Sequence, residues 1–324
     1  MRLGALAHIP LPPPSLQYRL SASTGATMKR VIRIAGWTIA GLVVVAGLVL
    51  ATGILLAERK AQRRVHVPAV PVAYRDDAQA LARGKYLYES RGCMECHGAD
   101  GRGRVMINDP GGMFVRTPNV TAGNPDVARY RERDWVLAIR HGVAPSGRPL
   151  MIMPSEDYNQ LSDEDLSALV AYMRSLPPLL SGMTEIRLPM MARVLYGFGM
   201  IEDAAAKIDH SRPPSPALEP APTAAYGAYV ANACIGCHGA DLAGGKIPGA
   251  PPDWPAAADL RPGAVMLRYR TPDRFIEMMR TGVRPDGTEV SKVMPFESLA
   301  KMSDTDLTAL YLHLKALPVT QAAR

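Results

Sequence analysis

Two five-residue motifs contain the side chains with the most specific chemistry in this chain of 324 residues. They are Cys93-Met94-Glu95-Cys96-His97 and Cys234-Ile235-Gly236-Cys237-His238. A C-x-x-C-H motif is typical of c-type haem attachment, in which two thiols form thioethers with the porphyrin and the histidine binds the iron. The two motifs use all four cysteines, so none remains for a disulfide or a thiol nucleophile. The pattern predicts two covalently bound haem c groups.

A methionine stands at the same distance behind each motif. Met153 follows Cys93 by 60 positions, and Met294 follows Cys234 by 60 positions. A proline comes next in both places. The pattern that follows recurs at an offset of 141, in the runs Leu161–Leu166 and Met302–Leu307. Repetition over this length indicates two copies of one structural unit.

The sequence pattern predicts the same helices in each copy, and the last helix of a copy should pack on its first. The opening helix should cover Ala78–Ser90 in the first copy. The last helices should begin after the N-caps Ser162 and Ser303, whose hydroxyls can accept hydrogen bonds from the first turn, and should end at prolines. Short amphipathic helices are expected between them, at Asp134–Arg140 and Asp273–Arg280.

With these motifs and spacings the chain resembles the class I cytochromes c, over roughly residues 77 to 178 and 224 to 318. The resemblance implies a mostly α fold with two tandem cytochrome c domains. It also implies that the motif histidine and the later methionine bind opposite faces of each iron. The ligand pairs would be His97 with Met153 and His238 with Met294, and the thioether residues would be Cys93, Cys96, Cys234 and Cys237.

The same resemblance suggests a partner for the first histidine. The carbonyl of Pro118 could accept a hydrogen bond from His97 Nδ1 and fix the ring. Pro118 could equally do no more than shape a turn. The corresponding stretch of the second copy, Lys246 to Pro262, is too diverged to align, so the partner of His238 stays open.

Details of the first copy resemble, more narrowly, the multihaem cytochrome subunits of membrane-bound alcohol and gluconate dehydrogenases. Those subunits usually carry three haems, whereas this chain has two motifs. The segments that carry the resemblance are Thr117-Pro118-Asn119-Val120-Thr121, Arg140-His141-Gly142-Val143 and Gly147-Arg148.

An apolar run near the N-terminus predicts a membrane anchor. Ile34 to Ala57 is 24 residues without a charged side chain, which as a helix spans about 36 Å, enough to cross a hydrocarbon core of roughly 30 Å. The run is too long for the apolar part of a signal peptide, so we expect an uncleaved anchor rather than a cleaved signal or a buried core helix. Basic residues flank both ends and do not set the orientation. Because the resemblance implies haem attachment outside the cytoplasm, we expect a single-pass protein of the inner membrane with its haem domains in the periplasm.

The net charge of +7 belongs to the N-terminal part of the chain. Residues 1–75 hold ten Lys and Arg and one acid, whereas the remainder holds 27 basic and 29 acidic residues. The two copies therefore offer no basic surface for nucleic acid, and we expect no nucleic-acid partner.

These features divide the chain into six segments. They are an N-terminal extension expected to be disordered (1–28), a transmembrane signal anchor (29–57), a tether that lifts the first domain off the membrane (58–76), cytochrome c domain 1 (77–180), a linker (181–223) and cytochrome c domain 2 (224–320). Within the linker, Leu188–Ile201 should form a helix and Arg212–Pro222 an extended proline-rich spacer.

Histidine and methionine on opposite faces of the iron leave no open position for oxygen or peroxide, and a thioether ligand raises the reduction potential. The pattern therefore predicts electron transfer rather than catalysis, by a membrane-anchored dihaem cytochrome of a periplasmic respiratory chain. Its donor would be a dehydrogenase or quinol-oxidising complex, and its acceptor another cytochrome or a terminal oxidase. Two alternatives are a dihaem cytochrome c peroxidase, which needs one distal position to open, and the dihaem subunit of a cbb3-type oxidase.

The cysteine pairs also suit two other kinds of site. Two C-x-x-C pairs can supply four thiolates to zinc, and a single pair is compatible with thioredoxin-like redox chemistry. Neither explanation accounts for the two histidines and the two methionines at identical distances.

Overall fold

A computed structural model describes residues 14–247, 249–251 and 253–319, with side chains from residue 28 onward. The chain divides into two compact units, residues 1–53 and 54–324. The second unit contains both repeats, which we call copy 1 (77–180) and copy 2 (224–319).

The N-terminal helix α1 covers Pro14–Gln62, and its part from Met28 onward is long and apolar enough to cross a membrane, by length and composition. We expected disorder up to residue 28, but residues 14–28 are helical; residues 1–13 lie outside the described residues. No proline occurs between Pro14 and Pro68, so nothing in the sequence breaks a helix that propagates from the apolar run toward the N-terminus.

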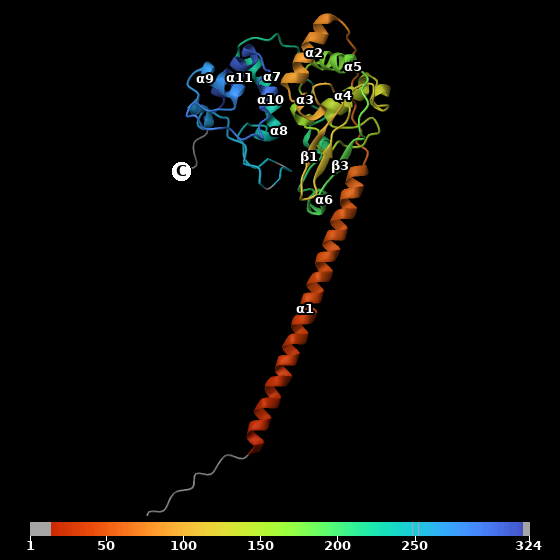
Figure 1. Ribbon diagram of the computed structural model, residues 1–324, viewed down its shortest axis with the longest axis vertical. Coiled ribbons are helices and arrows are strands. Elements are labelled where there is room, and N and C mark those ends of the chain that lie inside the picture. The colour runs from red at the N-terminus through yellow and green to blue at the C-terminus, as the bar shows by residue number, and fades with distance from the viewer. Residues whose placement is uncertain (1–13, 248, 252, 320–324) are drawn as a thin grey trace, which may run out of the picture. The chain divides into compact units, whose positions relative to one another are not determined.

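Copy 1 and copy 2 repeat the same helical order (Figure 1). Copy 1 contains α2 (Ala78–Ser90), α3 (Cys93–His97), η1 (Val127–Arg129), α4 (Glu132–His141), η2 (Ser155–Asp157) and α5 (Asp163–Ser175). Copy 2 contains α7 (Ala224–Ala231), η4 (Asn232–Cys234), α8 (Ile235–His238), η5 (Val265–Arg268), α9 (Pro272–Thr281), α10 (Phe296–Leu299) and α11 (Asp304–Ala316). The expected helices are present, and Ser162 and Ser303 cap α5 and α11 through hydrogen bonds from the amides of Asp165 and Asp306.

The first and last helices of each copy pack together, as expected. In both copies they cross at a glycine. A Cβ on Gly84 of α2 would lie 1.9 Å from the carbonyl oxygen of Ala168 in α5. A Cβ on Gly227 of α7 would lie 1.9 Å from the carbonyl oxygen of Ala309 in α11. Only glycine allows the two backbones to approach this closely, so both copies share one helix crossing.

Copy 1 has a small antiparallel sheet that the sequence did not predict. Strand β2 (Phe114–Arg116) pairs with β1 (Val105–Asn108) on one side and with β3 (Glu185–Arg187) on the other. The strand β3 comes from the linker, which continues into α6 (Met190–Gly197) and η3 (Ala204–Lys207). Helix α6 is shorter than the expected Leu188–Ile201.

Residues 63–76, which belong to the segment expected to be a tether (58–76), pack on copy 1. Val67 and Ala69 are buried in the core beside copy 1, and the amide of Val65 donates to the carbonyl of Gly147 (2.8 Å). The segment is apolar enough to pack, and it lies along copy 1.

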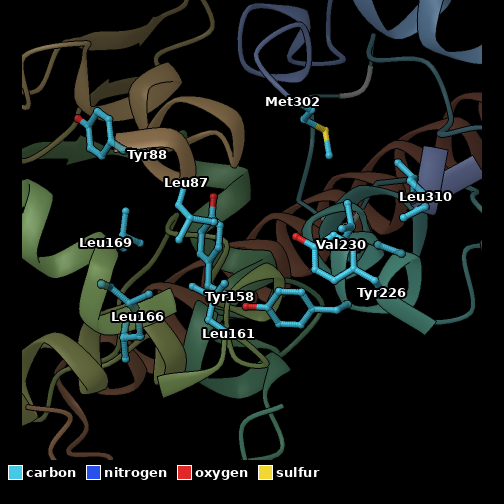
Figure 2. Packing of buried hydrophobic residues seen from close by; sticks show 14 of the residues in the cluster. Leu87, Tyr88, Tyr158, Leu161, Leu166, Leu169, Tyr226, Val230, Met302 and Leu310 are labelled. Carbon is cyan, nitrogen blue, oxygen red and sulfur yellow. The ribbon is translucent and has the colours of Figure 1, made fainter. Parts of the chain in front are cut away.

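Most of the buried apolar side chains of both copies belong to one continuous cluster. Figure 2 shows Leu87, Tyr158 and Leu166 of copy 1 in the same region of packing as Tyr226, Val230 and Leu310 of copy 2. The two copies therefore share a hydrophobic core and are not separate domains joined by a flexible linker.

Candidate functional site

Each C-x-x-C-H motif forms a short helix that ends at a glycine. Helix α3 is followed by Gly98 (φ 77°) and α8 by Gly239 (φ 79°), a conformation that favours glycine. The turn presents two thiols and an imidazole from about five residues of chain. Both motifs therefore end in the same turn, although α3 contains the whole first motif whereas Cys234 of the second ends the 3-10 helix η4.

Each motif histidine is oriented by a backbone carbonyl. His97 Nδ1 lies 2.9 Å from the carbonyl oxygen of Pro118, which confirms the prediction that this carbonyl is the hydrogen-bond partner of the ring. His238 Nδ1 lies 2.8 Å from the carbonyl oxygen of Ala258. A carbonyl can only accept, so Nδ1 carries the proton in both rings and the Nε2 lone pair is left for a metal. Burial lowers the pKa of both imidazoles, which favours the neutral form that binds iron.

A glycine behind each histidine closes the loop. The amide of Gly103 donates to the carbonyl of His97, and the amide of Gly244 donates to that of His238, both at 2.8 Å. A Cβ on Gly103 would lie 2.4 Å from the Thr117 carbonyl oxygen, and one on Gly244 equally close to that of Ala257. The two loops thus hold the ring-orienting carbonyls in equivalent places.

The four cysteines are free thiols in partly buried settings, except Cys237, which is exposed. Burial raises the pKa of Cys93 and of Cys234 to about 12, so these thiols are not activated nucleophiles at neutral pH. In copy 1 the sulfur of Met106, on β1, lies 3.3 Å from Cys96 Sγ.

The two predicted distal methionines occupy equivalent turns. Met153 and Met294 are partly buried and pack on the core cluster that Cys93 and Cys234 also contact. Their carbonyls accept hydrogen bonds from the residues two positions later, at 2.9 Å in both copies. Pro154 and Pro295, the residues after them, have nearly the same backbone angles (φ −80°, ψ 63° and φ −80°, ψ 68°).

The residues of both copies fit a covalently bound haem. Each provides two unpaired thiols, an imidazole whose Nε2 is free because Nδ1 is engaged, and a thioether on a neighbouring turn. Among the described residues no cluster of three or more His, Cys, Asp or Glu side chains could hold a metal ion. The donors suit iron in a porphyrin better than a zinc ion, which would need four converging protein ligands.

The sequence model of the cytochrome c family matches residues 81–177 and 223–318, more than half of the chain. The chain belongs to the cytochrome c family. Membership implies covalently bound haem c, and each matched segment contains one C-x-x-C-H motif.

Curated relatives of this cytochrome c are subunits of redox complexes. It is 29% identical over 274 residues to the gluconate 2-dehydrogenase cytochrome c subunit of Pantoea cypripedii, covering 75% of this chain and 61% of the relative. It is 27% identical over 274 residues to the cytochrome c subunit of the quinone-dependent alcohol dehydrogenase of Gluconacetobacter polyoxogenes (75% and 57%). A shorter match, 32% over 102 residues, is to the cbb3-type cytochrome c oxidase subunit CcoP of Helicobacter pylori strain 52 (31% and 30%). The chain spans about three fifths of the length of the first two relatives and less of the third.

Two reciprocal hydrogen bonds join the haem sites of the two cytochrome c domains. The carboxylate of Glu95, inside the first motif, accepts from the amide of Ser298 (2.9 Å), four residues after Met294. The carboxylate of Asp157, four residues after Met153, accepts from the amide of Gly236 inside the second motif (2.6 Å). Both pairs obey the offset of 141, so each attachment motif contacts the methionine turn of the other domain.

A second reciprocal contact links the opening helix of each domain to the last helix of the other. The hydroxyl of Tyr86 donates to Asp306 (2.7 Å) and accepts from the amide of Ser303 (2.9 Å). The hydroxyl of Tyr229 donates to Asp165 (2.6 Å) and accepts from the amide of Ser162 (3.2 Å). The two domains therefore meet through matching surfaces, in the manner of a two-fold dimer.

The buried carboxylates of Asp165 and Asp306 pair with arginines from different domains. Asp165 accepts two hydrogen bonds from Arg83 of its own domain (2.7 and 2.8 Å). Asp306 has Tyr226 in the place that corresponds to Arg83, and pairs instead with Arg91 of the other domain. Burial opposes the ionisation of Asp306, but Arg91 and the two tyrosine hydroxyls outweigh it and hold the pKa of Asp306 below its ordinary value.

Sequence reasoning missed the carbonyl of Ala258 and the cross-domain contacts. The signal for Ala258 was present, because an offset of 140 relates Pro118 to Ala258 just as it relates Trp135 to Phe275. The contacts of Glu95 and Asp157 also obey the repeat offset. A repeat can show that positions correspond, but it does not show that they touch across an interface.

Proposed function

We propose that this chain is a membrane-anchored dihaem cytochrome c that receives electrons at one domain, passes them to the other, and delivers them to a further redox protein in the periplasm. The observation that carries the proposal is the reciprocal pair of hydrogen bonds Glu95–Ser298 and Asp157–Gly236, each of which joins the haem-attachment motif of one domain to the methionine turn of the other. Haem, when bound, supplies a one-electron couple between ferric and ferrous iron.

The residues of the chain would hold two such groups by equivalent sets of atoms. Thioethers would form at Cys93 and Cys96 and at Cys234 and Cys237. The imidazoles of His97 and His238 are already oriented by carbonyls, and Met153 and Met294 would supply the opposite ligands. The apolar cluster that the two domains share would favour electron exchange with little solvent reorganisation.

The donor we propose is a dehydrogenase, because the relatives with the widest coverage are named as cytochrome c subunits of dehydrogenases. The match to a cbb3-type oxidase subunit supports a second candidate, an electron-delivering subunit of an oxidase. Isolation of the haem-loaded chain from native membranes would separate the two through the subunits that copurify. Rapid turnover of hydrogen peroxide would instead indicate a peroxidase.

The haem stoichiometry tests the proposal directly. The wild-type chain should bind two haems that remain attached after denaturation, and the variants C93A/C96A and C234A/C237A should each retain one. The near-infrared absorption of methionine-ligated ferric haem should fall by about half in M153A and in M294A, since each variant removes one of two proposed ligands. Full absorption in either variant would exclude that methionine as a ligand.

A further inference from the structure

The linker carries a group of exposed apolar side chains that has no counterpart in the described part of copy 2. The group consists of Met190 and Met191 in the first turn of α6 and Phe198 and Met200 just after its end, which are 56%, 56%, 47% and 73% exposed and are here called the methionine patch. Single exposed apolar residues are ordinary on protein surfaces, but four within eleven positions mark an interaction surface. The functional sites described above use none of them.

The methionine patch is fixed to the chain that directly follows the apolar run. Lys60 Nζ donates to the carbonyls of Tyr196 and Ile201, both at 3.3 Å, and lies 4.6 Å from the centre of the Tyr196 ring. Arg63 Nη2 donates to Asp203, a fully buried carboxylate, at 2.7 Å. Helix α6 and the residues after it are therefore attached at both Lys60 and Arg63.

This attachment sets the depth of the patch. Lys60 lies three residues beyond Ala57, the last residue of the apolar run, which is about 4.5 Å along a helix. The polar layer of a bilayer extends about 5–7 Å beyond the hydrocarbon core. If Ile34–Ala57 spans a membrane, the carboxyl end of α6 lies at the level of the lipid headgroups, and the methionines are within one short helix of it.

We propose that the methionine patch inserts into the outer surface of the bilayer and holds the cytochrome c domains against it. This inference rests on the membrane anchor of the proposed function. An interfacial helix places its apolar residues at the boundary of headgroups and acyl chains, with cations toward the phosphates. The nearby cations fit that arrangement: Arg59 is exposed, and Arg187 and Arg193 lie on β3 and α6. Methionine suits an irregular lipid surface because its side chain is flexible and apolar.

Lipid photolabelling of the full haem-loaded chain tests the proposal. The protein is placed in nanodiscs of phosphatidylethanolamine and phosphatidylglycerol that contain a phospholipid with a diazirine in its acyl chain. After irradiation and digestion, mass spectrometry should find adducts both in Ile34–Ala57 and in the peptide that contains residues 190–200. Leu267, which is 66% exposed on copy 2, serves as the background position.

Variants sharpen the test. M191Q/M200Q should lower the adduct yield in the 190–200 peptide several-fold and leave labelling of the apolar run unchanged, whereas L267Q should change neither. Retention of both haems verifies that each variant is folded. Adducts in the apolar run together with only background labelling of 190–200 would overturn the patch and leave the anchor intact. Labelling of neither segment would overturn the anchor and the patch together, and cross-linking of the patch to a partner protein instead of lipid would also overturn the proposal.

Discussion

The two cytochrome c domains have the same arrangement of backbone around the motif histidine and differ in the structure that surrounds it. The carbonyl that orients the histidine, the glycine that closes the loop and the methionine turn recur in both. In the first domain a hairpin, β1–β2, places Met106 beside Cys96, whereas in the described part of the second domain the corresponding stretch forms only one isolated bridge, Gly245 with Ala257. The first histidine is correspondingly more buried than the second.

The second difference lies at the interface. The first domain neutralises its buried aspartate with its own Arg83, but the second domain depends on Arg91 of the first. Without the first domain, Asp306 would be a buried charge without this cation, so the stability of the second domain should depend on its neighbour. The two domains therefore share the geometry around the motif histidine, whereas the buried aspartate is paired within the domain in one case and across the interface in the other.

Removal of Arg91 should have the largest effect. R91M leaves Asp306, whose side chain is 1% exposed, without its cation and should cost about 3–5 kcal/mol of unfolding free energy. The matched variant R83M should cost less, because Arg83 and Asp165 are 23% and 11% exposed. Denaturant titration of the haem-loaded protein measures both, and R91M/D306L should recover much of the loss. Equal costs for R91M and R83M would contradict the proposed dependence of domain 2 on domain 1.

Substitution at the shared helix crossing should affect both domains alike. G84A and G227A each place a methyl 1.9 Å from a backbone carbonyl oxygen, so the helices must separate at a cost of about 3 kcal/mol. Thermal unfolding measures the loss. G111A is the control, because its methyl would meet only the side chain of Asp109. A clearly smaller loss in one of the two crossing variants would show that the crossings are not equivalent.

The reciprocal tyrosines should show smaller and nearly equal effects. Y86F and Y229F each remove a hydrogen bond to a buried carboxylate in the other domain and should cost about 1.5–3 kcal/mol. Denaturant titrations of the two variants and of the double variant provide the comparison. A negligible cost for either one would mean that the two contacts do not contribute equally to the interface.

The sequence predicted the parts of this molecule that depend on local chemistry and on repetition. The caps at Ser162 and Ser303 follow from local motifs, whereas the ring-orienting role of Pro118 was one of two interpretations and was suggested by the family resemblance. The ligand roles of Met153 and Met294 stay predictions. The sheet was missed because β3 comes from the linker, about 70 residues after β2, and each strand has only three or four residues.

The interface was missed for a related reason. The partner of Asp306 lies 215 positions earlier in the chain, and no periodicity within one repeat relates Arg91 to it. The packed course of residues 63–76 was also missed, because charge and proline content suggested solvent while Val67 and Ala69 supply enough apolar surface to bury. Contacts between repeats are set by tertiary packing, which the offset of 141 does not encode.

A pH dependence, small over any single pH unit, should distinguish the two cross-domain carboxylates. Burial raises the pKa of Asp157 to about 7 from its ordinary 3.8, against the hydrogen bond from Gly236, which lowers it. The folded state therefore holds a proton that the unfolded chain releases, and stability should fall as pH rises from about 4 to about 7, by at most about 1.4 kcal/mol per pH unit for one proton. D157N should remove this decline, whereas E95Q, which removes the carboxylate of the reciprocal pair, should preserve it. Denaturant midpoints measured across that range decide the assignment, since an unchanged slope in D157N would place the titrating group elsewhere.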